Sequence, residues 1–264
     1  MPTALITGPS SGIGMATALE LGRRGSHVIA AGRSAERAEP VLASIRAGGG
    51  SGEFVELDLA SMASVRGAAE RVVETGHLLD ILVNNAGIGI NRRGLTEDGF
   101  EVHFGINHLG HFLLTRELLT RFRPGSRIVT LASAVHFRAE GIDFARMRSP
   151  TRGLGLAEYA VSKLANVLFI RELARRHPDL RSYAVHPGLV RTRIIPAPIR
   201  LLSGKRMRAP QQGADTVVWC ATSPKVADDS GHYFQDRSVA TPSVPAQDDE
   251  LAAELWERSE EWCS

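Results

Sequence analysis

The sequence predicts a doubly wound α/β fold, in which a mostly parallel central sheet carries helices on both of its faces. Short apolar runs alternate with longer helical patterns six times along the chain. The runs are almost continuously apolar, as expected of strands that are covered on both sides, and the helices supply the crossovers that parallel strands need. No linker rich in Pro, Gly or Ser interrupts the pattern, so we expect one domain over residues 1–264.

The individual elements follow from these runs and from the residues that punctuate them. Glycines such as Gly25 and Gly48–Gly50 mark where helices stop and turns begin. Strands are expected at residues 4–7, 27–31, 54–57, 81–83, 127–131, 181–185 and 231–234. Helices are expected at residues 13–24, 35–47, 63–74, 104–122, 158–176, 211–222 and 252–262, with a proline-rich loop at 189–210.

The composition excludes several classes of function. Hydrophobic residues make up 43% and charged residues 23% of the chain, and the net charge is +2 with both signs interspersed, which argues against binding to nucleic acid or to an anionic membrane. The two cysteines, Cys220 and Cys263, form neither a disulfide framework nor a metal site. No apolar stretch approaches the roughly 18 residues of a membrane span, and a strand pattern begins at once. We therefore expect a cytoplasmic protein.

A glycine-rich turn lies between the first strand and the first helix, with the sequence Thr7-Gly8-Pro9-Ser10-Ser11-Gly12-Ile13-Gly14. Glycines let the backbone approach a diphosphate, and the N-terminus of the following helix offers free N–H groups to it. The common dinucleotide fingerprint has one residue between its first two glycines, whereas three residues separate Gly8 from Gly12. A structural turn would also need glycine, but the strand–turn–helix context favours a Rossmann-type nucleotide site.

The end of the second strand bears on the choice of cofactor. NAD-binding folds usually place an acidic residue about 20 residues after the glycines, where it holds the ribose 2′-hydroxyl. Here the strand ends in Ala31-Gly32-Arg33. A guanidinium suits a 2′-phosphate in charge and geometry, which predicts NADP(H), although a surface arginine opening a loop is the alternative. The missing acid also argues against a methyltransferase.

Tyr159 and Lys163 stand four residues apart on a predicted helix and therefore share one face. An unperturbed phenol has a pKa of about 10, and a nearby ammonium or a cationic nicotinamide lowers it. Such a phenol exchanges a proton while a hydride moves. A pair at this spacing is by itself often a chance surface pair, so its weight depends on the other motifs.

Together these motifs resemble the short-chain dehydrogenase/reductase family over almost the whole chain. Asp58-Leu59 resembles its adenine contact, and Asn84-Asn85-Ala86-Gly87 resembles its motif after the fourth strand. Asn107 and Ser133 match the residues that complete a catalytic tetrad with Tyr159 and Lys163. The cofactor contacts that the resemblance implies, together with Arg33, are Thr7, Gly8, Ser10, Ser11, Gly12, Ile13, Gly14, Arg33, Asp58, Leu59, Asn85, Ala86, Gly87, Tyr159, Lys163, Pro187, Gly188, Val190 and Thr192.

Within that family the sequence is similar to the retinol-dehydrogenase-like branch. The helix motif from Gly105 to Phe112 and the segment from Val185 to Gly188 resemble signatures of that branch, and the 26 positions from Ser133 to Tyr159 suit it as well. Vertebrate members of the branch commonly carry an apolar N-terminal anchor, which this sequence lacks. We therefore expect no membrane-embedded retinoid role.

The resemblance also implies what each catalytic residue does. Tyr159 would be the general acid in reduction and the base in oxidation, while Lys163 would lower its pKa and hold the nicotinamide ribose. Ser133 would donate a hydrogen bond to the substrate oxygen, and Asn107 would hold a water that links Lys163 to solvent. Relatives commonly pair through the helices expected at 104–122 and 158–176, so we expect a homodimer or homotetramer.

The substrate is expected to be an apolar ketone or aldehyde, or the matching alcohol, rather than a free sugar or a phosphorylated metabolite. Sites in such sheets lie beyond the carboxyl ends of the strands, and the segments that leave those ends, residues 134–137 and 189–202, are rich in apolar residues. Residues 189–212 are expected to form a substrate loop or lid.

Two alternatives remain open at this stage. A non-catalytic nucleotide sensor would be expected to lose Tyr159 or Lys163, and an epimerase or dehydratase would need a larger C-terminal substrate domain. His103, His108 and His111 lack a companion carboxylate or cysteine at ligand spacing, so we expect structural or interface roles for them and no metal.

Overall fold

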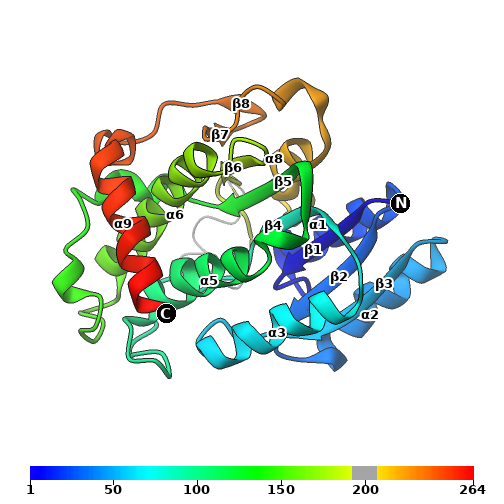
Figure 1. The fold of residues 1–264 in the computed structure, drawn as a ribbon, viewed down its shortest axis with the longest axis horizontal. Coiled ribbons are helices and arrows are strands. Elements are labelled where there is room, and N and C mark those ends of the chain that lie inside the picture. Colours follow the sequence, from blue (N-terminus) through cyan, green and yellow to red (C-terminus); the bar gives the residue numbers. More distant parts are fainter. Residues whose placement is uncertain (192–206) are drawn as a thin grey trace.

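An eight-stranded sheet forms the centre of the molecule, in the order β3-β2-β1-β4-β5-β6-β7-β8 (Figure 1). The computed structural model describes residues 1–191 and 207–264. Neighbouring strands pair in parallel except for β7 and β8, which are antiparallel. The predicted fold class is thereby confirmed. The strands are β1 (Thr3–Thr7), β2 (His27–Gly32), β3 (Ser51–Glu56), β4 (Leu79–Asn84), β5 (Phe122–Leu131), β6 (Arg181–His186), β7 (Tyr233–Gln235) and β8 (Ser238–Val239).

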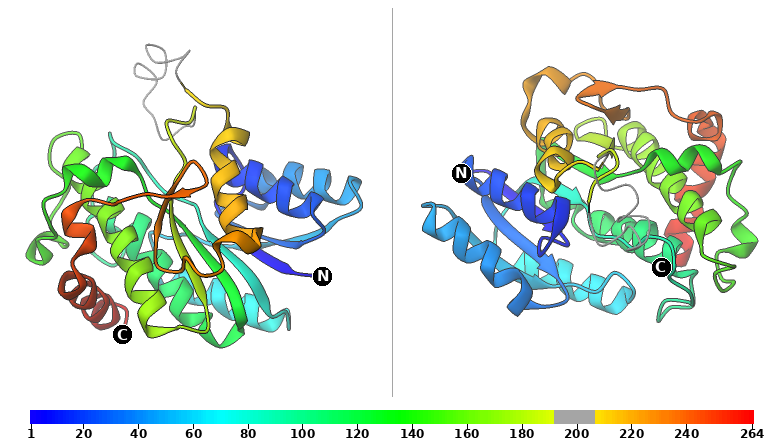
Figure 2. Two further views of the ribbon diagram at one scale, coloured as in Figure 1. Left: turned by 90° about the horizontal axis from the view of Figure 1, so that it is seen from above. Right: turned by 180° about the vertical axis from the view of Figure 1, so that it is seen from behind.

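Helices cover both faces of this sheet, as Figure 2 shows. Alternate residues of β1 point to opposite faces: Leu5 joins the apolar cluster under α3, α5 and α6, whereas Ala4 and Ile6 join the cluster under α1 and α8. The C-terminal helix α9 packs against α6. The helices are α1 (Gly12–Arg23), α2 (Ala35–Ala47), α3 (Met62–Glu74), α4 (Val102–Phe104), α5 (Gly110–Glu117), α6 (Leu156–Arg176), α8 (Pro210–Thr222) and α9 (Asp249–Trp262).

The prediction of one continuous helix over residues 104–122 is wrong in its continuity and in its end. The chain forms the short helix α4, then a π-helical segment from Gly105 to Leu109, then α5, and β5 already begins at Phe122. Pro124 confines the residue before it to extended conformations, and Gly125 has a φ of +82°, so this part of the chain cannot continue a helix. The strand therefore starts five residues earlier than the apolar run at 127–131 suggested.

Two further boundaries differ from expectation at the edges of the sheet. β3 begins at Ser51 rather than at residue 54. Only Val55 is buried in this edge strand, so its first residues lack the apolar run on which the prediction relied. The final strand lies at 233–235 rather than 231–234, and the short hairpin partner β8 was not predicted. Within residues 1–191 and 207–264, every helix falls short of the length or apolarity that a membrane crossing requires.

The proposed substrate loop at 189–212 is only partly described. Residues 192–206, including Thr192, lie outside the described residues. At the two ends of this stretch, Val190 pairs with Arg208 in a parallel bridge, and the Arg208 N–H donates to the Leu189 carbonyl at 2.8 Å. Both ends of the loop are therefore joined beside the carboxyl end of β6.

Candidate active site

The sheet order reverses between β1 and β4, and this point defines a crevice. From β1 the chain moves outward to β2 and β3, and then returns to β4 on the other side of β1. Ligands of open α/β sheets bind at such a point, beyond the carboxyl ends of the strands. The glycine-rich turn after β1 and the Asn85–Gly87 segment after β4 both lie there.

The glycine-rich turn fits a diphosphate. Gly8 and Gly12 have φ values of +66° and +58°, in the left-handed region that favours glycine. A Cβ at Gly14 would lie 2.3 Å from the Gly8 carbonyl oxygen, so the start of α1 can pack against the turn only as glycine. Ser11 is the N-cap of α1 but makes no side-chain cap hydrogen bond. The N–H groups of the first turn are therefore available to an anionic ligand, with Ser10, Ser11 and Ile13 beside them.

Asn85 and Thr7 join this turn to the end of β4. The Asn85 and Ala86 N–H groups both donate to Thr7 Oγ1 at 2.9 Å, and Asn85 Nδ2 donates to the Thr7 carbonyl at 2.8 Å. Thr7 Oγ1 also lies 2.9 Å from His111 Nε2. Sequence analysis proposed a structural or interface role for His111 and missed this link, because the two residues are 104 positions apart.

Arg33 and the Asp58-Leu59 pair lie on the other flank of the turn, at the carboxyl ends of β2 and β3. Arg33 directly follows β2 and is exposed. Asp58 Oδ1 accepts a hydrogen bond from the Ala60 N–H at 3.0 Å, and the Asp58 N–H donates to Ser64 Oγ at 2.9 Å, which fixes this loop. Leu59 is buried. The Leu57 N–H donates to the Gly32 carbonyl at 2.9 Å, so the segments that carry Arg33 and Asp58 leave the sheet side by side.

Lys163 is buried in α6 and points toward the end of β5. Its side chain is 6% exposed, and Nζ donates to the Leu131 carbonyl at 2.9 Å. Burial lowers the pKa of Lys163 from the usual 10.5 to about 8, because the ammonium loses its hydration. Asn166, one turn further along α6, donates to the same carbonyl at 3.0 Å.

Tyr159 lies beside Ser133, which follows β5. Burial raises the pKa of Tyr159, and a hydrogen bond with the Ser133 side chain acts in the opposite direction. Lys163 Nζ lies 5.8 Å from the centre of the Tyr159 ring. In this arrangement the Lys163 ammonium faces the Leu131 carbonyl, and burial is the largest influence on the pKa of the phenol.

Asn107 lies in the middle of the π-helical segment, a geometry that is frequent at functional sites. Its Oδ1 accepts from the Ile88 N–H at 2.8 Å, and its Nδ2 donates to Ser162 Oγ at 3.0 Å. A Cβ on Gly87 would lie 2.8 Å from Asn107 Oδ1 and 4.0 Å from Lys163 Nζ. Asn107 thus ties the loop after β4 to the helix that carries Lys163.

The segment after β6 closes the crevice on the side of α8. Gly188 has a φ of +80°, and Val190 is buried against Gly213, where a Cβ would lie 2.5 Å from a Val190 methyl group. Pro187 is partly buried between Gly188 and the end of β6. His186, the last residue of β6, accepts a hydrogen bond from the Ala134 N–H at 3.3 Å, which joins this segment to the one that carries Ser133.

The three histidines near Asn107 do not converge on one another. His103 forms hydrogen bonds with the Glu101 carboxylate at 2.9 Å and with the Gly89 carbonyl at 3.1 Å. His108 forms a hydrogen bond with the Ser259 hydroxyl in α9 at 3.1 Å. His111 bonds the Asn107 carbonyl at 3.1 Å as well as Thr7. All three are buried with separate partners, which agrees with the structural role expected of them.

The switch point and the glycine-rich turn place the molecule among dinucleotide-binding α/β proteins. Residues 2–197 match the short chain dehydrogenase family, and the chain belongs to this family of oxidoreductases. The suspected family resemblance is thereby confirmed.

Individual relatives support this placement over nearly the whole chain. The chain is 40% identical to polyprenol dehydrogenase of Mus musculus, over 96% of this chain and 81% of that protein. It is 41% identical to retinol dehydrogenase 14 of Mus musculus, over 98% of this chain and 84% of that protein. The similarity to the retinol-dehydrogenase-like branch therefore extends well beyond the motifs.

Solved structures share the fold. An uncharacterized protein from Mycobacterium paratuberculosis superimposes with a TM-score of 0.82 and 35% identity, over 100% of this chain and 93% of that one. An alcohol dehydrogenase from the archaeon Thermococcus sibiricus, complexed with 5-hydroxy-NADP, gives a TM-score of 0.66 and 26% identity, over 83% of this chain and 89% of that one.

Proposed function

We propose that the protein transfers hydride between NADP(H) and an apolar ketone or aldehyde, or the corresponding alcohol. The observation that carries this proposal is the grouping of Ser133, Tyr159 and Lys163 at the carboxyl end of β5, beside the crevice at the glycine-rich turn. A bound nicotinamide supplies the hydride, and the protein supplies binding, orientation and proton transfer.

In this proposal Tyr159 moves the proton. Its hydroxyl gives a proton to the substrate oxygen during reduction and takes one back during oxidation. The Ser133 hydroxyl donates to the same oxygen and stabilises the charge that develops there. The Lys163 ammonium binds the nicotinamide ribose, and its positive charge favours the phenolate of Tyr159 once substrate and cofactor bring the groups together. Asn107 holds the water through which the proton is replaced.

Arg33 supports NADP(H) rather than NAD(H) as the cofactor. Its exposed guanidinium directly follows β2, at the position where NAD-binding folds carry an acid for the ribose 2′-hydroxyl. A guanidinium there offers two parallel hydrogen bonds to a 2′-phosphate. The 5-hydroxy-NADP complex of the Thermococcus sibiricus alcohol dehydrogenase is consistent with this choice.

Exposed apolar side chains support an apolar substrate. Phe137 after β5 is 55% exposed and Leu189 after β6 is 47% exposed. Leu154 and Leu156 at the start of α6 are also exposed, within five residues of Tyr159. Their positions around the catalytic group fit a pocket wall for an apolar molecule. The names of the two relatives, a polyprenol and a retinol dehydrogenase, point to substrates of the same chemistry.

The test of this proposal compares specificity constants for NADPH-dependent reduction of matched carbonyl compounds that differ only in apolar bulk. We expect kcat/KM to rise with chain length or ring size, by up to about tenfold per added methylene. If small, polar or phosphorylated carbonyls are preferred by tenfold or more, the apolar-pocket assignment is wrong. No NADPH consumption with any of them, despite tight NADPH binding, would favour a nucleotide sensor.

We also propose that the protein forms a homodimer or homotetramer through the side of the molecule that carries α5 and α6. There α9 packs on these helices, with Trp256 lying 5.0 Å from the Phe112 ring and 5.9 Å from the Phe169 ring, measured between ring centres. A second copy of the chain that binds to this side of the molecule therefore also contacts α9. A monomer in sedimentation at micromolar concentration contradicts the assembly.

A further inference from the structure

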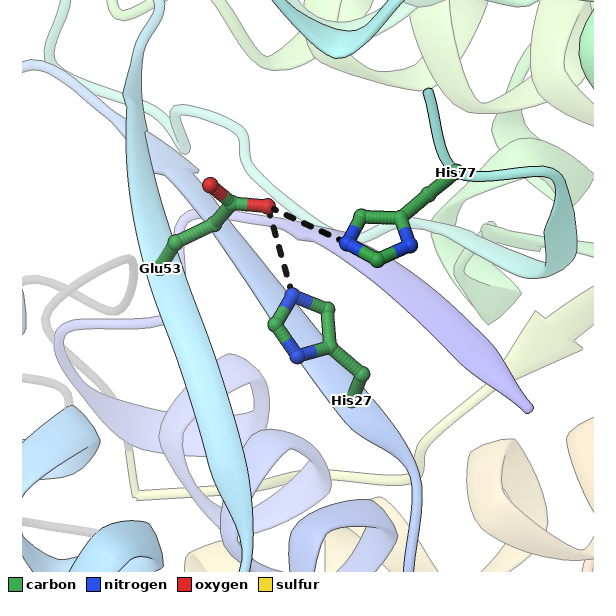
Figure 3. A group of neighbouring side chains, drawn as sticks. All are labelled: His27, Glu53 and His77. Atoms are coloured by element: carbon green, nitrogen blue, oxygen red, sulfur yellow. Dashed lines mark hydrogen bonds and ion pairs between the residues drawn. The ribbon is translucent and has the colours of Figure 1, made fainter. Parts of the chain in front are cut away.

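Two histidines and a glutamate gather at the amino end of the sheet, far along the strands from the crevice (Figure 3). His27 is the first residue of β2, Glu53 lies in β3, and His77 precedes β4. The β2–β3 register pairs Ile29 with Glu53, so His27 and Glu53 are diagonal neighbours on one face of the sheet. No metal was expected from the sequence, because none of the three stands in a ligand-spacing motif.

The geometry of the cluster is close to that of a metal centre. His27 Nε2 lies 3.2 Å and His77 Nε2 lies 3.9 Å from the same carboxylate oxygen, Glu53 Oε1, and the three ligand atoms lie within 4.8 Å of one another. In a tetrahedral zinc site with bonds of about 2.1 Å, ligand atoms are about 3.4 Å apart. The His27–Glu53 distance already fits, and His77 has to move closer to the other two ligands.

A contact with Ser51 orients the His27 ring so that Nε2 faces Glu53. His27 Nδ1 lies 2.9 Å from Ser51 Oγ, and the Ser51 hydroxyl itself donates to Met1 Sδ at 3.8 Å. When Nδ1 carries the proton and donates to Ser51 Oγ, the Nε2 lone pair is free to bind a metal ion beside Glu53 Oε1. Outer partners of this kind commonly fix the tautomer of a metal-binding histidine.

We propose that His27, Glu53 and His77 bind a divalent transition-metal ion of the Zn²⁺ or Ni²⁺ type. Two imidazole nitrogens and one carboxylate oxygen suit these ions, whereas Mg²⁺ and Ca²⁺ prefer oxygen ligands alone. The Glu53 and His77 side chains are 38% and 42% exposed, so solvent water reaches the remaining coordination position. The bound ion joins β2, β3 and the α3–β4 connection, which makes its role structural rather than catalytic.

The test is a titration of tag-free, full-length protein, stripped with EDTA, with Zn²⁺ in a calorimeter and with Co²⁺ by visible absorption. Wild type should bind one ion, give the visible bands of a nitrogen- and oxygen-ligated Co²⁺ and melt at a higher temperature with Zn²⁺. Glu53→Gln and His77→Ala should each raise Kd by at least about tenfold and lose the thermal shift. The exposed His232, whose Nδ1 lies 3.1 Å from the Asp229 carbonyl, provides the matched control His232→Ala, whose Kd should stay unchanged.

A further variant, at Ser51, tests the contact between Ser51 and the His27 ring. Ser51→Ala should weaken Zn²⁺ binding by about tenfold, because it frees the His27 ring while leaving all three ligands in place. Turnover with NADPH should be the same with and without Zn²⁺, so the outcome is independent of the proposed function. No binding by wild type, or equal binding by wild type and Glu53→Gln, overturns the metal site.

Discussion

Thr7 and His111 join the cofactor turn to the helical segment that carries Asn107 through one buried hydrogen bond of 2.9 Å. Burial lowers the pKa of His111 to about 4, so the ring is neutral at physiological pH. Its Nδ1 faces the Asn107 carbonyl and must donate, which leaves Nε2 to accept from the Thr7 hydroxyl. The two lone pairs of Thr7 Oγ1 take the Asn85 and Ala86 N–H groups, so every polar atom of the link has one defined role.

The first prediction is that His111→Phe weakens NADPH binding as well as stability. The substitution leaves the Thr7 hydroxyl and the Asn107 carbonyl without their buried partner, at a cost of about 1–3 kcal/mol in the free energy of unfolding, and it loosens the turn that meets the cofactor. Urea unfolding and fluorescence titration with NADPH measure the two effects. His108→Phe is the matched control, because it lies one turn away, bonds Ser259 instead and should lose stability alone. Equal losses of NADPH affinity in both variants would contradict the link.

A second prediction concerns the proton-transfer group. Tyr159→Phe keeps the ring and removes only the hydroxyl, so kcat should fall by about 10²-fold or more while the Kd for NADPH stays nearly constant. Tyr183→Phe removes a buried hydroxyl that donates to the Val226 carbonyl at 2.8 Å, far from the crevice. That control should lose about 1 kcal/mol of stability and keep its kcat. Retention of most activity in Tyr159→Phe would place the chemistry elsewhere.

A third prediction follows from the pKa of Lys163, which burial lowers to about 8. The ammonium that favours the anionic cofactor is present below this pH, so NADPH affinity should weaken as the pH rises through about 8, by up to tenfold per unit. The free energy of unfolding should change in the opposite direction and rise with pH. The unfolded chain keeps the lysine proton to about 10.5, so the free energy of unfolding contributed by this group rises between about 8 and 10.5.

Titration of NADPH between pH 6.5 and 9.5, in steps of about half a unit, measures the first of these effects. Lys163→Met keeps the length of the side chain without the charge, and its affinity should show no break near pH 8. If the wild-type affinity is flat over this range, or if Lys163→Met shows the same break, the pH dependence comes from another group.

The fourth prediction concerns the cofactor's ribose phosphate. Arg33→Asp should shift the ratio of kcat/KM for NADPH over NADH toward NADH by about 10²-fold, because it replaces a partner for the 2′-phosphate with a carboxylate that accepts from a 2′-hydroxyl and repels the phosphate. Arg46→Asp changes charge equally at the far end of α2, where Arg46 pairs with Glu39, and should leave the ratio unchanged. Equal use of both cofactors by wild type would refute the NADP(H) preference.

The order of strands and helices was predictable because parallel strands covered on both faces must be apolar throughout. The π-helical segment could not be predicted. The apolar pattern over residues 104–122 is the same whether the backbone forms an α-helix or includes one π-helical turn. Pro124 and Gly125 indicate that the helix ends before them and that β5 starts early. The prediction followed the apolar pattern instead. The edge strand β3 was shortened in the prediction because Ser51, Gly52 and Glu53 bury little.

The candidate site was predictable where neighbours in space are neighbours in sequence, as for the turn from Thr7 to Gly14 or for Tyr159 and Lys163. Contacts between distant segments were not. His27, Glu53 and His77 come together only through the strand register and the α3–β4 connection. The direction that the Lys163 side chain takes, toward the Leu131 carbonyl, is likewise specified by no local pattern.

The position of β3 at the end of the strand order bears on how the molecule avoids self-association. An edge strand presents unpaired peptide groups to any other strand that meets it. β3 carries Glu53 and Glu56, so two copies that approached edge to edge would bring like charges together along the new pairing. At the opposite edge, β8 consists of only Ser238 and Val239, which is too short to template a ladder. The acidic residues of β3 and the brevity of β8 thus protect the sheet against aggregation while its centre stays fully paired.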